Sequence, residues 1–412
     1  MYTTTVKLGS PPREYTVLID TGSDLLWVSC NHCDNCPRSN GVGFKFNFFD
    51  TIDSSTAAMI YCSDRLCPFG VQGVDVRCLP PIKQCTYTYG YQDNSTTSGV
   101  YVTDEMHFDM ILGQPSPSSV NSSATVSFGC GTHLGGGLIE TPTAFDGIFG
   151  FGPGPLSIVS QLSAREIIPN VFSHCLKGDG NGGGILALGA VVDPSIVYSP
   201  LAPSKSHYYM NLESIAVNGQ LLSIDPVAFS PAKYGDRGTT IDSGTSLAYL
   251  FPEVYNPLVN AITSMVSQFS HPFVLAGNPC YLVSTSVDAF PLVSFNFAGG
   301  ASMDVKPAQY LVQSDFMNAG LWCIGFQKVE SGHQILGDLV LKDKIVVYDL
   351  ANQQIGWTNY NCSMPVNVNV TVSKDKNNNP RAKRSSSIIS SELGILSKLL
   401  PVIIVALFIP FL

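Results

Sequence analysis

The sequence predicts a mostly β protein with two related lobes, and three observations support this prediction. Runs rich in Val, Ile, Thr, Tyr and Phe are separated by Gly, Ser, Asn and Pro clusters, which is typical of short strands joined by turns. The 412 residues suffice for two domains, each with its own core. Asp-Thr-Gly-Ser at 20–23 and Asp-Ser-Gly-Thr at 242–245 each follow one apolar run and precede another. Similarity at half-chain distance indicates two lobes related by a pseudo-twofold axis, with a cleft between them.

Charge and composition limit the classes of partner. Only 13% of the residues are charged, the formal net charge is −9, and the sequence has no basic stripe. A nucleic acid is therefore not expected as a partner. The seven histidines are scattered without metal-ligand spacing, so they give no reason to expect a metal site.

Cysteine usage predicts an oxidising compartment. Twelve cysteines, an even number, favour a disulfide-stapled secreted protein over a cytosolic one, and eight of them lie in the first third of the chain. The C-x-x-C-x-x-C run at 30–36 has the spacing of an iron–sulfur or zinc ligand set, but disulfides are the favoured interpretation in a secreted β protein. Sequons predict glycosylation at Asn94, Asn121 and Asn369, and a fourth, at Asn361, is the poorest candidate because its middle residue is a cysteine.

The two ends of the chain differ in their targeting signals. The first residues lack the charged start and apolar core of a signal peptide, and we interpret them as a start inside the mature domain. Residues 366–384 have the composition of a solvated linker, and small residues Ser385, Ser386 and Ser387 follow, then a spacer and an apolar run. This order predicts a GPI-attachment signal, with a retained apolar tail anchor as the alternative. We expect the protein in the secretory pathway or at the extracellular face of the plasma membrane.

The repeated segments explain why a carboxylate stands in an apolar run. Asp20 and Asp242 both sit where a buried strand is predicted, and an isolated charge there is strongly destabilising. Brought face to face about 3 Å apart, two carboxyl groups share one proton. One of them can then take a proton from water while the other hydrogen-bonds a substrate carbonyl. The sequence thus predicts a catalytic pair of aspartates.

The residues that follow each aspartate have predicted supporting roles. Three matched pairs follow the aspartates: Thr21 and Ser243, Gly22 and Gly244, Ser23 and Thr245. The glycines permit tight turns that bring backbone N–H groups to the carboxylates. The hydroxyls of the last pair can hydrogen-bond the outer carboxylate oxygens, and those of the first pair can tie the two loops together.

With these residues the chain resembles the pepsin-like aspartic endopeptidases, in particular the cysteine-rich plant-type members. The resemblance covers about residues 2–362 and includes Trp27, which in the family hydrogen-bonds the tyrosine of a flap over the cleft. It also includes the apolar-apolar-Gly segments at 145–152 and 335–338, which pass beneath the aspartate loops, and a flap segment at 85–99. Together these motifs are highly specific for the family.

The resemblance implies a bilobal pepsin-like fold with one catalytic aspartate in each lobe. It implies an N-terminal lobe at 1–195, a C-terminal lobe at 196–362, and a linker and tail at 363–412. The implied activity is hydrolysis of peptide bonds in extended polypeptides with an acidic pH optimum, by a monomer that needs no metal and no cofactor. It also implies a disulfide between Cys280 and Cys323, while the sequence leaves the pairings among the cysteines from Cys30 to Cys85 open.

The flap departs from the family pattern. The family has a sequence close to Tyr-Gly-x-Gly-Ser, and here Tyr91 is followed by Gln92, Asp93 and Asn94. We assign Tyr91 as the flap tyrosine, with Tyr89 as the alternative. Loss of both glycines, and a glycan at Asn94, would stiffen or crowd the cleft. A catalytically weak binding or inhibitor protein on the same scaffold is therefore the alternative function.

Overall fold

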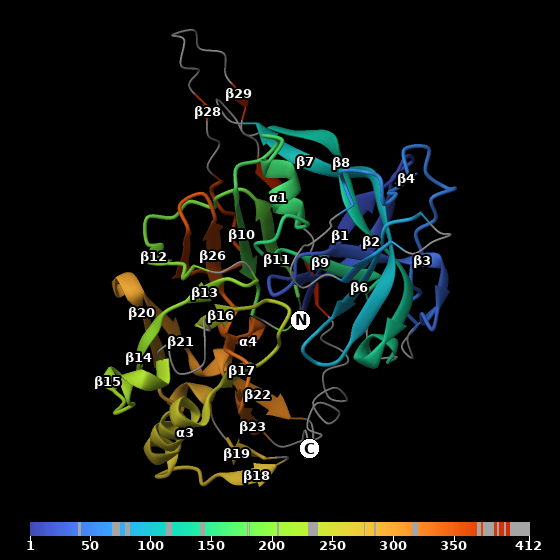
Figure 1. Cartoon of the computed structure of the whole chain (residues 1–412). Coiled ribbons are helices and arrows are strands. Elements are labelled where there is room, and N and C mark those ends of the chain that lie inside the picture. Colours follow the sequence, from blue (N-terminus) through green and yellow to red (C-terminus); the bar gives the residue numbers. More distant parts are fainter. Residues whose placement is uncertain are drawn as a thin grey trace.

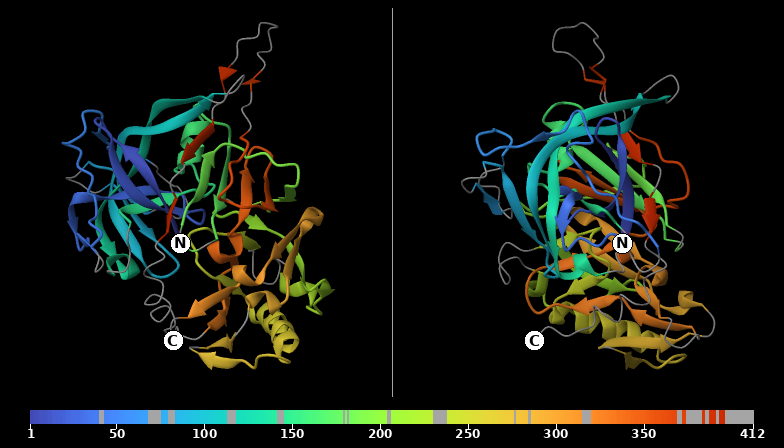
Figure 2. Two further views of the ribbon diagram at one scale, coloured as in Figure 1. Left: turned by 180° about the vertical axis from the view of Figure 1, so that it is seen from behind. Right: turned by 90° about the vertical axis from the view of Figure 1, so that its right-hand side faces the viewer.

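The fold is mostly β and has two lobes, as the sequence predicted (Figure 1). The computed structural model describes residues 1–39, 43–67, 75–78, 83–112, 118–140, 145–178, 180, 182–203, 206–229, 238–275, 277–283, 286–314, 320–368, 372–373, 383–384, 387–390 and 393–395. The lobe rich in early residues and the lobe that carries helix α3 lie next to each other in all three views (Figures 1 and 2).

Three strands in the first lobe position the first aspartate. Strand β2 (Arg13–Asp20) ends on Asp20, and β3 (Leu26–Asp34) begins after the loop. Strand β9 (Gly147–Gly150) lies between them, parallel to β2 and antiparallel to β3. Its four residues are all buried, which explains the apolar-apolar-Gly pattern of the sequence. The segment at 145–152 therefore passes beneath the Asp20 loop.

The second lobe repeats this arrangement. Strand β16 (Thr239–Ile241) leads into Asp242, and β17 (Ala248–Leu250) follows the loop. Strand β25 (Gln334–Leu336) pairs parallel with β16 and antiparallel with β17. The same three-strand pattern therefore holds each aspartate loop, which gives the pseudo-twofold relation that the sequence repeat predicted.

A sheet shared by both halves of the chain joins the lobes. Its strands lie in the order β12 (Val197–Pro200), β27 (Gln354–Asn359), β26 (Lys344–Asp349), β10 (Val171–Leu176) and β11 (Gly184–Leu188). Every residue of β10 is buried, and five of six in β26, because both faces of these strands are covered. Residues near the C-terminal end of the second lobe thus build the connection to the first.

The flap is a long antiparallel hairpin. Strand β6 (Thr86–Gly90) pairs with the start of β7 (Thr96–Leu112), and β7 pairs along its length with β8 (Ser118–Gly135). Figure 1 shows the β6–β7 end of this hairpin reaching toward the second lobe. The tip contacts both lobes, because Trp27 of the first lobe donates to Tyr91 and Gln92 reaches His333 of the second.

Apolar residues recur at helical spacing over residues 252–269, a pattern that predicts a helix there, and helix α3 (Pro252–Val266) forms in this segment. It starts with proline at its first position, where no N–H is needed, and buries one apolar stripe. The smaller elements include α1 (Ile158–Ser163), α4 (Asp338–Leu341), β1 (Tyr2–Leu8), β4 (Ala58–Met59), β5 (Asp75–Arg77), β13 (Tyr209–Met210), β14 (Leu212–Val217), β15 (Gln220–Leu221), β18 (Phe273–Leu275), β19 (Asn278–Leu282), β20 (Val293–Phe297), β21 (Ser302–Val305), β22 (Leu311–Ser314), β23 (Leu321–Ile324) and β24 (Phe326–Lys328).

All twelve cysteines form disulfides, so the disulfide interpretation of the 30–36 run is correct. The pairs are Cys30–Cys130, Cys33–Cys36, Cys62–Cys78, Cys67–Cys85, Cys175–Cys362 and Cys280–Cys323. Cys30 does not pair within the 30–36 run but with Cys130 of β8, 100 residues later in the chain. Sequence spacing could not indicate this pair. Cys175–Cys362 closes 187 residues and fixes the end of the second lobe against the shared sheet.

Parts of the predicted tail lie outside the described residues. These are residues 369–371, 374–382, 385–386, 391–392 and 396–412, which include Asn369, Ser385 and Ser386. Two short strands from this region, β30 (Ser387–Ser390) and β31 (Leu393–Ile395), pair with β11 and β1 respectively. In the part of the chain that the structure describes, no helix is long and apolar enough to cross a bilayer.

Candidate active site

The two aspartates meet at the centre of the site, where the lobes face each other. Asp20 is only 6% exposed, and its carboxyl group is within hydrogen-bonding range of the Asp242 carboxyl group. The Gly22 N–H donates to Asp20 Oδ1 at 2.9 Å, and the Gly244 N–H donates to Asp242 Oδ1 at 2.8 Å. The inner oxygen of each carboxylate is therefore held by the backbone of its own loop.

The outer oxygens are held by side chains. Ser23 Oγ donates to Asp20 Oδ2, and Thr245 Oγ1 donates to Asp242 Oδ2 at 2.6 Å. Each carboxylate thus accepts two hydrogen bonds from its own loop, which satisfies most of a charge that would otherwise be destabilising in this buried position. The two halves of the site have matching geometry.

Thr21 and Ser243 connect the two loops by four reciprocal hydrogen bonds. The Ser243 N–H donates to Thr21 Oγ1 at 3.0 Å, and the Thr21 N–H donates to Ser243 Oγ at 3.3 Å. Ser243 Oγ then donates to the Ile19 carbonyl at 2.9 Å, and Thr21 Oγ1 to the Ile241 carbonyl at 3.2 Å. Both side chains are fully buried, so these bonds fix the distance between the two aspartate loops.

Gly22 and Gly244 must be glycine because the carboxylate of the opposite loop lies close to each of them. A Cβ at Gly22 would lie 2.8 Å from Asp242 Oδ2, and one at Gly244 would lie 2.2 Å from Asp20 Oδ1. Neither glycine has a positive φ, so the constraint is space and not backbone conformation. The sequence indicated a tight turn here, but the close approach of the opposite carboxylate could only come from the tertiary structure.

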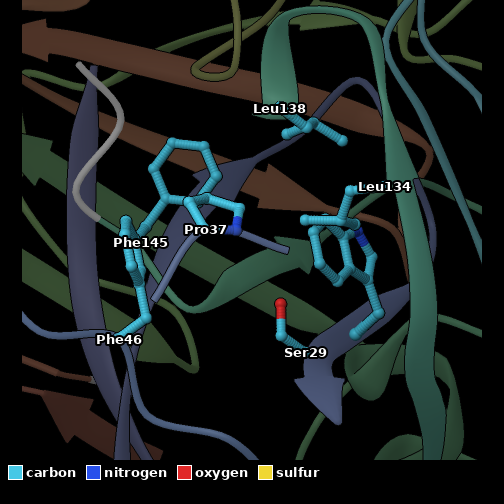
Figure 3. A pocket seen from close by; sticks show the side chains of 7 residues that line it. Ser29, Pro37, Phe46, Leu134, Leu138 and Phe145 are labelled. Carbon is cyan, nitrogen blue, oxygen red and sulfur yellow. The ribbon is translucent and has the colours of Figure 1, made fainter. Parts of the chain in front are cut away.

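The flap is attached to the site through Trp27 and Tyr91. Trp27 Nε1 donates to Tyr91 Oη at 2.7 Å, and Tyr89 packs against Tyr91 with 5.0 Å between ring centroids. Behind the indole is a cavity of about 10 Å³, roughly the room of one water molecule. Figure 3 shows its labelled lining residues: Ser29, Pro37, Phe46, Leu134, Leu138 and Phe145. The indole is therefore closely packed and keeps its N–H directed at the flap.

The flap tip accommodates the replacement of its glycines. Only Asn94 among its described residues has a positive φ, at +63°, and asparagine tolerates this conformation. Asp93 closes the turn by accepting from the Ser95 N–H and Ser95 Oγ, both at 2.9 Å. Gln92 therefore occupies an ordinary backbone conformation, and its side chain is exposed. The tip is a well-formed turn without either glycine.

Several supporting residues lie far from the motifs and were not predicted. Tyr348 Oη, from β26 of the shared sheet, donates to Thr21 Oγ1 at 3.4 Å, and its ring stacks on Phe172. Tyr208 Oη donates to the Phe151 carbonyl at 2.7 Å, next to the strand beneath the Asp20 loop. Nothing in the local sequence around Tyr348 or Tyr208 indicates these contacts, because strand pairing over long distances creates them.

The pKa of Asp20 is raised well above its ordinary value. Burial is the main cause, and the negative charge of Asp242 adds to it, while the Ser23 and Gly22 hydrogen bonds oppose it. Because the two carboxyl groups interact this strongly, they titrate as one unit. The pair therefore favours a state with one shared proton.

Asp24 is a second buried carboxyl group beside the dyad. It is 7% exposed, and Oδ1 accepts from the Gly154 N–H at 2.7 Å. Burial raises its pKa to about 6, and the Gly154 hydrogen bond only partly opposes this shift. The sequence signal for this group is the acidic residue that directly follows the Asp-Thr-Gly-Ser motif at 20–23.

Comparisons with known proteins agree with the geometry. Residues 2–190 match the family described as "Xylanase inhibitor N-terminal", and residues 207–359 match "Xylanase inhibitor C-terminal". Aspartic proteinase 36 of Arabidopsis thaliana is 38% identical over 375 residues, which cover 89% of this chain and 75% of that protein. Aspartic proteinase nepenthesin-2 of Nepenthes gracilis is 28% identical over 384 residues, covering 88% and 78%.

A bilobal β fold with one aspartate loop from each lobe defines the class of the aspartic proteinases. Within that class, the chain belongs to the pepsin-like family that contains these plant proteins, and it is an aspartic endopeptidase. In the described residues, no group of three or more His, Cys, Asp or Glu side chains could hold a metal ion.

We predict that Ser243→Ala destabilises the protein through the loop connection. It removes the acceptor of the Thr21 N–H and the donor to the Ile19 carbonyl, both buried. The free energy of unfolding should fall by about 2–4 kcal/mol in urea titrations. Ser243→Thr is the matched control, because the other lobe has a threonine at the equivalent position, and it should stay near wild type. Equal loss in both variants would contradict a role for the hydroxyl.

We predict that Asp24 makes the fold more stable in acid than at neutral pH. Its folded pKa of about 6 lies above the ordinary value of 3.8, so the folded state binds this proton more tightly. The resulting stabilisation is complete below pH 3.8 and is lost as the pH rises through 6. Asp24→Asn imitates the protonated form and should reduce the stability difference between pH 4.5 and 7 by about 2 kcal/mol.

The control for this titration is Asp225→Asn, which changes an exposed aspartate and keeps its hydrogen bond to the Val227 N–H. This variant should leave the stability difference between pH 4.5 and pH 7 unchanged. Urea titrations at both pH values measure it. If wild type and Asp24→Asn lose equal stability between pH 4.5 and 7, Asp24 does not carry this dependence.

Proposed function

We propose that the protein hydrolyses peptide bonds in extended polypeptides by means of a water molecule activated by Asp20 and Asp242. The observation that carries this proposal is the complete set of matched hydrogen bonds around both carboxyl groups, connected by Thr21 and Ser243. Each group is oriented by its own loop, and the loops are fixed to each other. Such a preorganised pair is suited to acid–base chemistry on a bound substrate.

In the proposed mechanism the shared proton resides on Asp20, because burial and the charge of Asp242 both favour its neutral form. Asp242 is then the base that takes a proton from the attacking water. Asp20 donates a hydrogen bond to the scissile carbonyl as its oxygen gains negative charge. When the carbon–nitrogen bond of the tetrahedral intermediate breaks, a proton passes to the leaving amine, and the acid and amine products are released.

Activity requires the pH range in which the pair holds one proton. Above it Asp20 loses the proton that polarises the carbonyl, and below it Asp242 is protonated and cannot act as a base. We propose an acidic optimum, because the protonated forms of the buried Asp24 and Asp146 also stabilise the fold in acid: burial raises the pKa of each to about 6. No metal or organic cofactor enters the proposed steps.

The flap supplies the cover of the substrate cleft. Tyr91 is half-buried and held by Trp27, and the charge of Asp20 contributes, after burial, to the raised pKa of its phenol, so it lies near the two aspartates. An extended substrate would lie between the flap and the aspartate loops and would bind through its backbone. Closure over the peptide would exclude water other than the one that reacts.

We expect Asp20→Asn to lose peptidase activity by at least about a thousandfold in kcat, because an amide cannot share the dyad proton. Peptide cleavage would be assayed across pH 3 to 7 on wild type and variant, with pepstatin-type inhibition as a first check. Asp225→Asn is the control for a surface aspartate. Circular dichroism would establish that Asp20→Asn is folded, and equal activity in the variant and wild type would contradict the proposal.

An inhibitor or binding protein on the same scaffold is the alternative function. The matching family is described as a xylanase inhibitor, which favours keeping this function as a candidate. The complete hydrogen bonding of both carboxylates supports the peptidase instead. Folded wild-type protein that binds an endoxylanase, and that cleaves no peptide in the assay above, would establish the alternative.

We further propose that the protein is secreted, glycosylated and tethered to the extracellular face of the plasma membrane. Asn94 at the flap tip and Asn121 on β8 are both exposed, so an oligosaccharide can be attached at either site. The proposed organisation is two lobes at 1–195 and 196–362, joined by the shared sheet, and a linker and GPI signal at 363–412. A retained apolar tail is the alternative form of attachment.

The attachment can be tested on intact cells that express the chain behind a signal peptide. Phosphatidylinositol-specific phospholipase C should release a GPI-anchored protein into the medium, because it removes the diacylglycerol part of the anchor. Detection of the protein in the supernatant, with and without enzyme, measures this release. Release by proteolysis within the linker, but not by the phospholipase, would indicate a retained apolar tail.

A further inference from the structure

Two histidines and a tyrosine of the second lobe gather under the flap tip. The rings of His207 and His333 are 5.0 Å apart between centroids, and the ring of Tyr209 lies edge-on to His333 at 5.5 Å. Tyr209 Oη is 3.4 Å from His207 Nδ1. From the first lobe, Gln92 Nε2 of the flap reaches His333 Nε2 at 3.3 Å. We call these four residues the histidine cluster.

The histidine cluster lies beside Asp242. Strand β13 pairs with β16 so that Tyr209 is opposite Thr240. Continuing this antiparallel register by two residues places His207 opposite Asp242. The electrostatics agree, because the Asp242 charge raises the pKa of His207 against the larger lowering caused by burial. The cluster is thus next to the reacting carboxyl groups on the side of the second lobe.

The contact with Gln92 places the cluster at the cleft and not behind it. Gln92 is exposed and belongs to the flap, which covers the aspartate loops, whereas His333 precedes β25, the strand beneath the Asp242 loop. A side chain of the substrate that points toward the second lobe from under the flap would therefore meet His333. His333 itself is 8% exposed, because Gln92, His207 and Tyr209 cover most of it.

The chemistry of the cluster favours a negatively charged group. The Gln92 amide N–H donates to His333 Nε2 only while that nitrogen is an acceptor. Protonation of His333 turns Nε2 into a donor, so both groups would then direct donors at a substrate anion, and the Tyr209 hydroxyl can donate as well. The charged group that faces the cluster from β16 is Asp242, which favours the protonated form of His207, although burial lowers the pKa of His207 on balance. His333, which His207, Tyr209 and Gln92 contact, is then the group that faces the substrate.

We propose that His333, supported by His207, forms a subsite that takes a carboxylate-bearing side chain of the substrate, aspartate or glutamate, next to the scissile bond. The inference rests on the proposed peptidase function and adds a specificity to it. A protonated His333 would form a charge-assisted hydrogen bond to the substrate carboxylate, with Gln92 closing over it from the flap. His207 and His333 are specificity-determining residues in this proposal and take no part in proton transfer at the dyad.

The test compares peptides that differ only in charge. Starting from a peptide that the wild-type enzyme cleaves, glutamate or glutamine is placed in turn at the three positions on either side of the scissile bond. The ratio of kcat/KM for the two peptides is measured at pH 5. At one position the wild type should prefer glutamate by about tenfold, a factor that corresponds to about 1.4 kcal/mol and suits one charge-assisted hydrogen bond.

Variants identify the residues behind this preference. His333→Gln and the double variant His207→Gln with His333→Gln should reduce the ratio to about one, because glutamine carries no charge. His271→Gln, which changes an exposed histidine of the same lobe, should keep the wild-type ratio. Since each ratio is taken on one enzyme preparation, partial misfolding of a variant cancels.

The outcomes separate the subsite from the peptidase function. Cleavage by wild type without a glutamate preference at any position would overturn the subsite and leave the peptidase function intact. A preference that survives both histidine variants would also overturn it, as would a preference for an aromatic side chain over glutamate at the position beside the cluster. Failure of the wild type to cleave any peptide would overturn both proposals together.

Discussion

The reciprocal hydrogen bonds between Thr21 and Ser243 are the constraint on which the rest of the site depends. Two buried carboxyl groups repel when both are ionised, so they stay close only if something else fixes the loops that carry them. Here the fixing groups are backbone N–H and carbonyl groups of both lobes, joined by two buried hydroxyls. This connection allows one proton to be shared and forces the facing residues to be glycine.

The surrounding structure keeps that connection in place. The shared sheet brings residues from both ends of the second lobe against the first, and a single continuous core of apolar side chains extends through both. Tyr348 carries the contact from this sheet to Thr21, while β9 and β25 support the two loops from below. The flap tip contacts its surroundings through the Trp27–Tyr91 and Gln92–His333 hydrogen bonds, and few such contacts need to break for it to open for substrate.

Much of the site could be predicted because its chemistry is local. Each carboxylate is held by residues two and three positions after it, so a four-residue motif contains most of the hydrogen bonding. Trp27 and Tyr91 could be placed through the family resemblance. His207 and His333 could not, because they precede different strands, β13 and β25, and come together only when those strands flank β16. Asp24 was visible in the sequence, but its burial was not.

The sequence by itself determined the class of fold, the two aspartate loops, the helix after the second loop and the disulfide chemistry of its cysteines. Alternating and buried apolar runs, turn residues and a repeated motif are local signals, and they can be recognised in the sequence without knowledge of tertiary contacts. The tertiary structure alone decided how the ten cysteines other than Cys280 and Cys323 pair, why Gly22 and Gly244 admit no side chain, and how β26 connects the lobes. These features depend on groups far apart in the chain that meet only when both lobes are folded, so no local pattern records them.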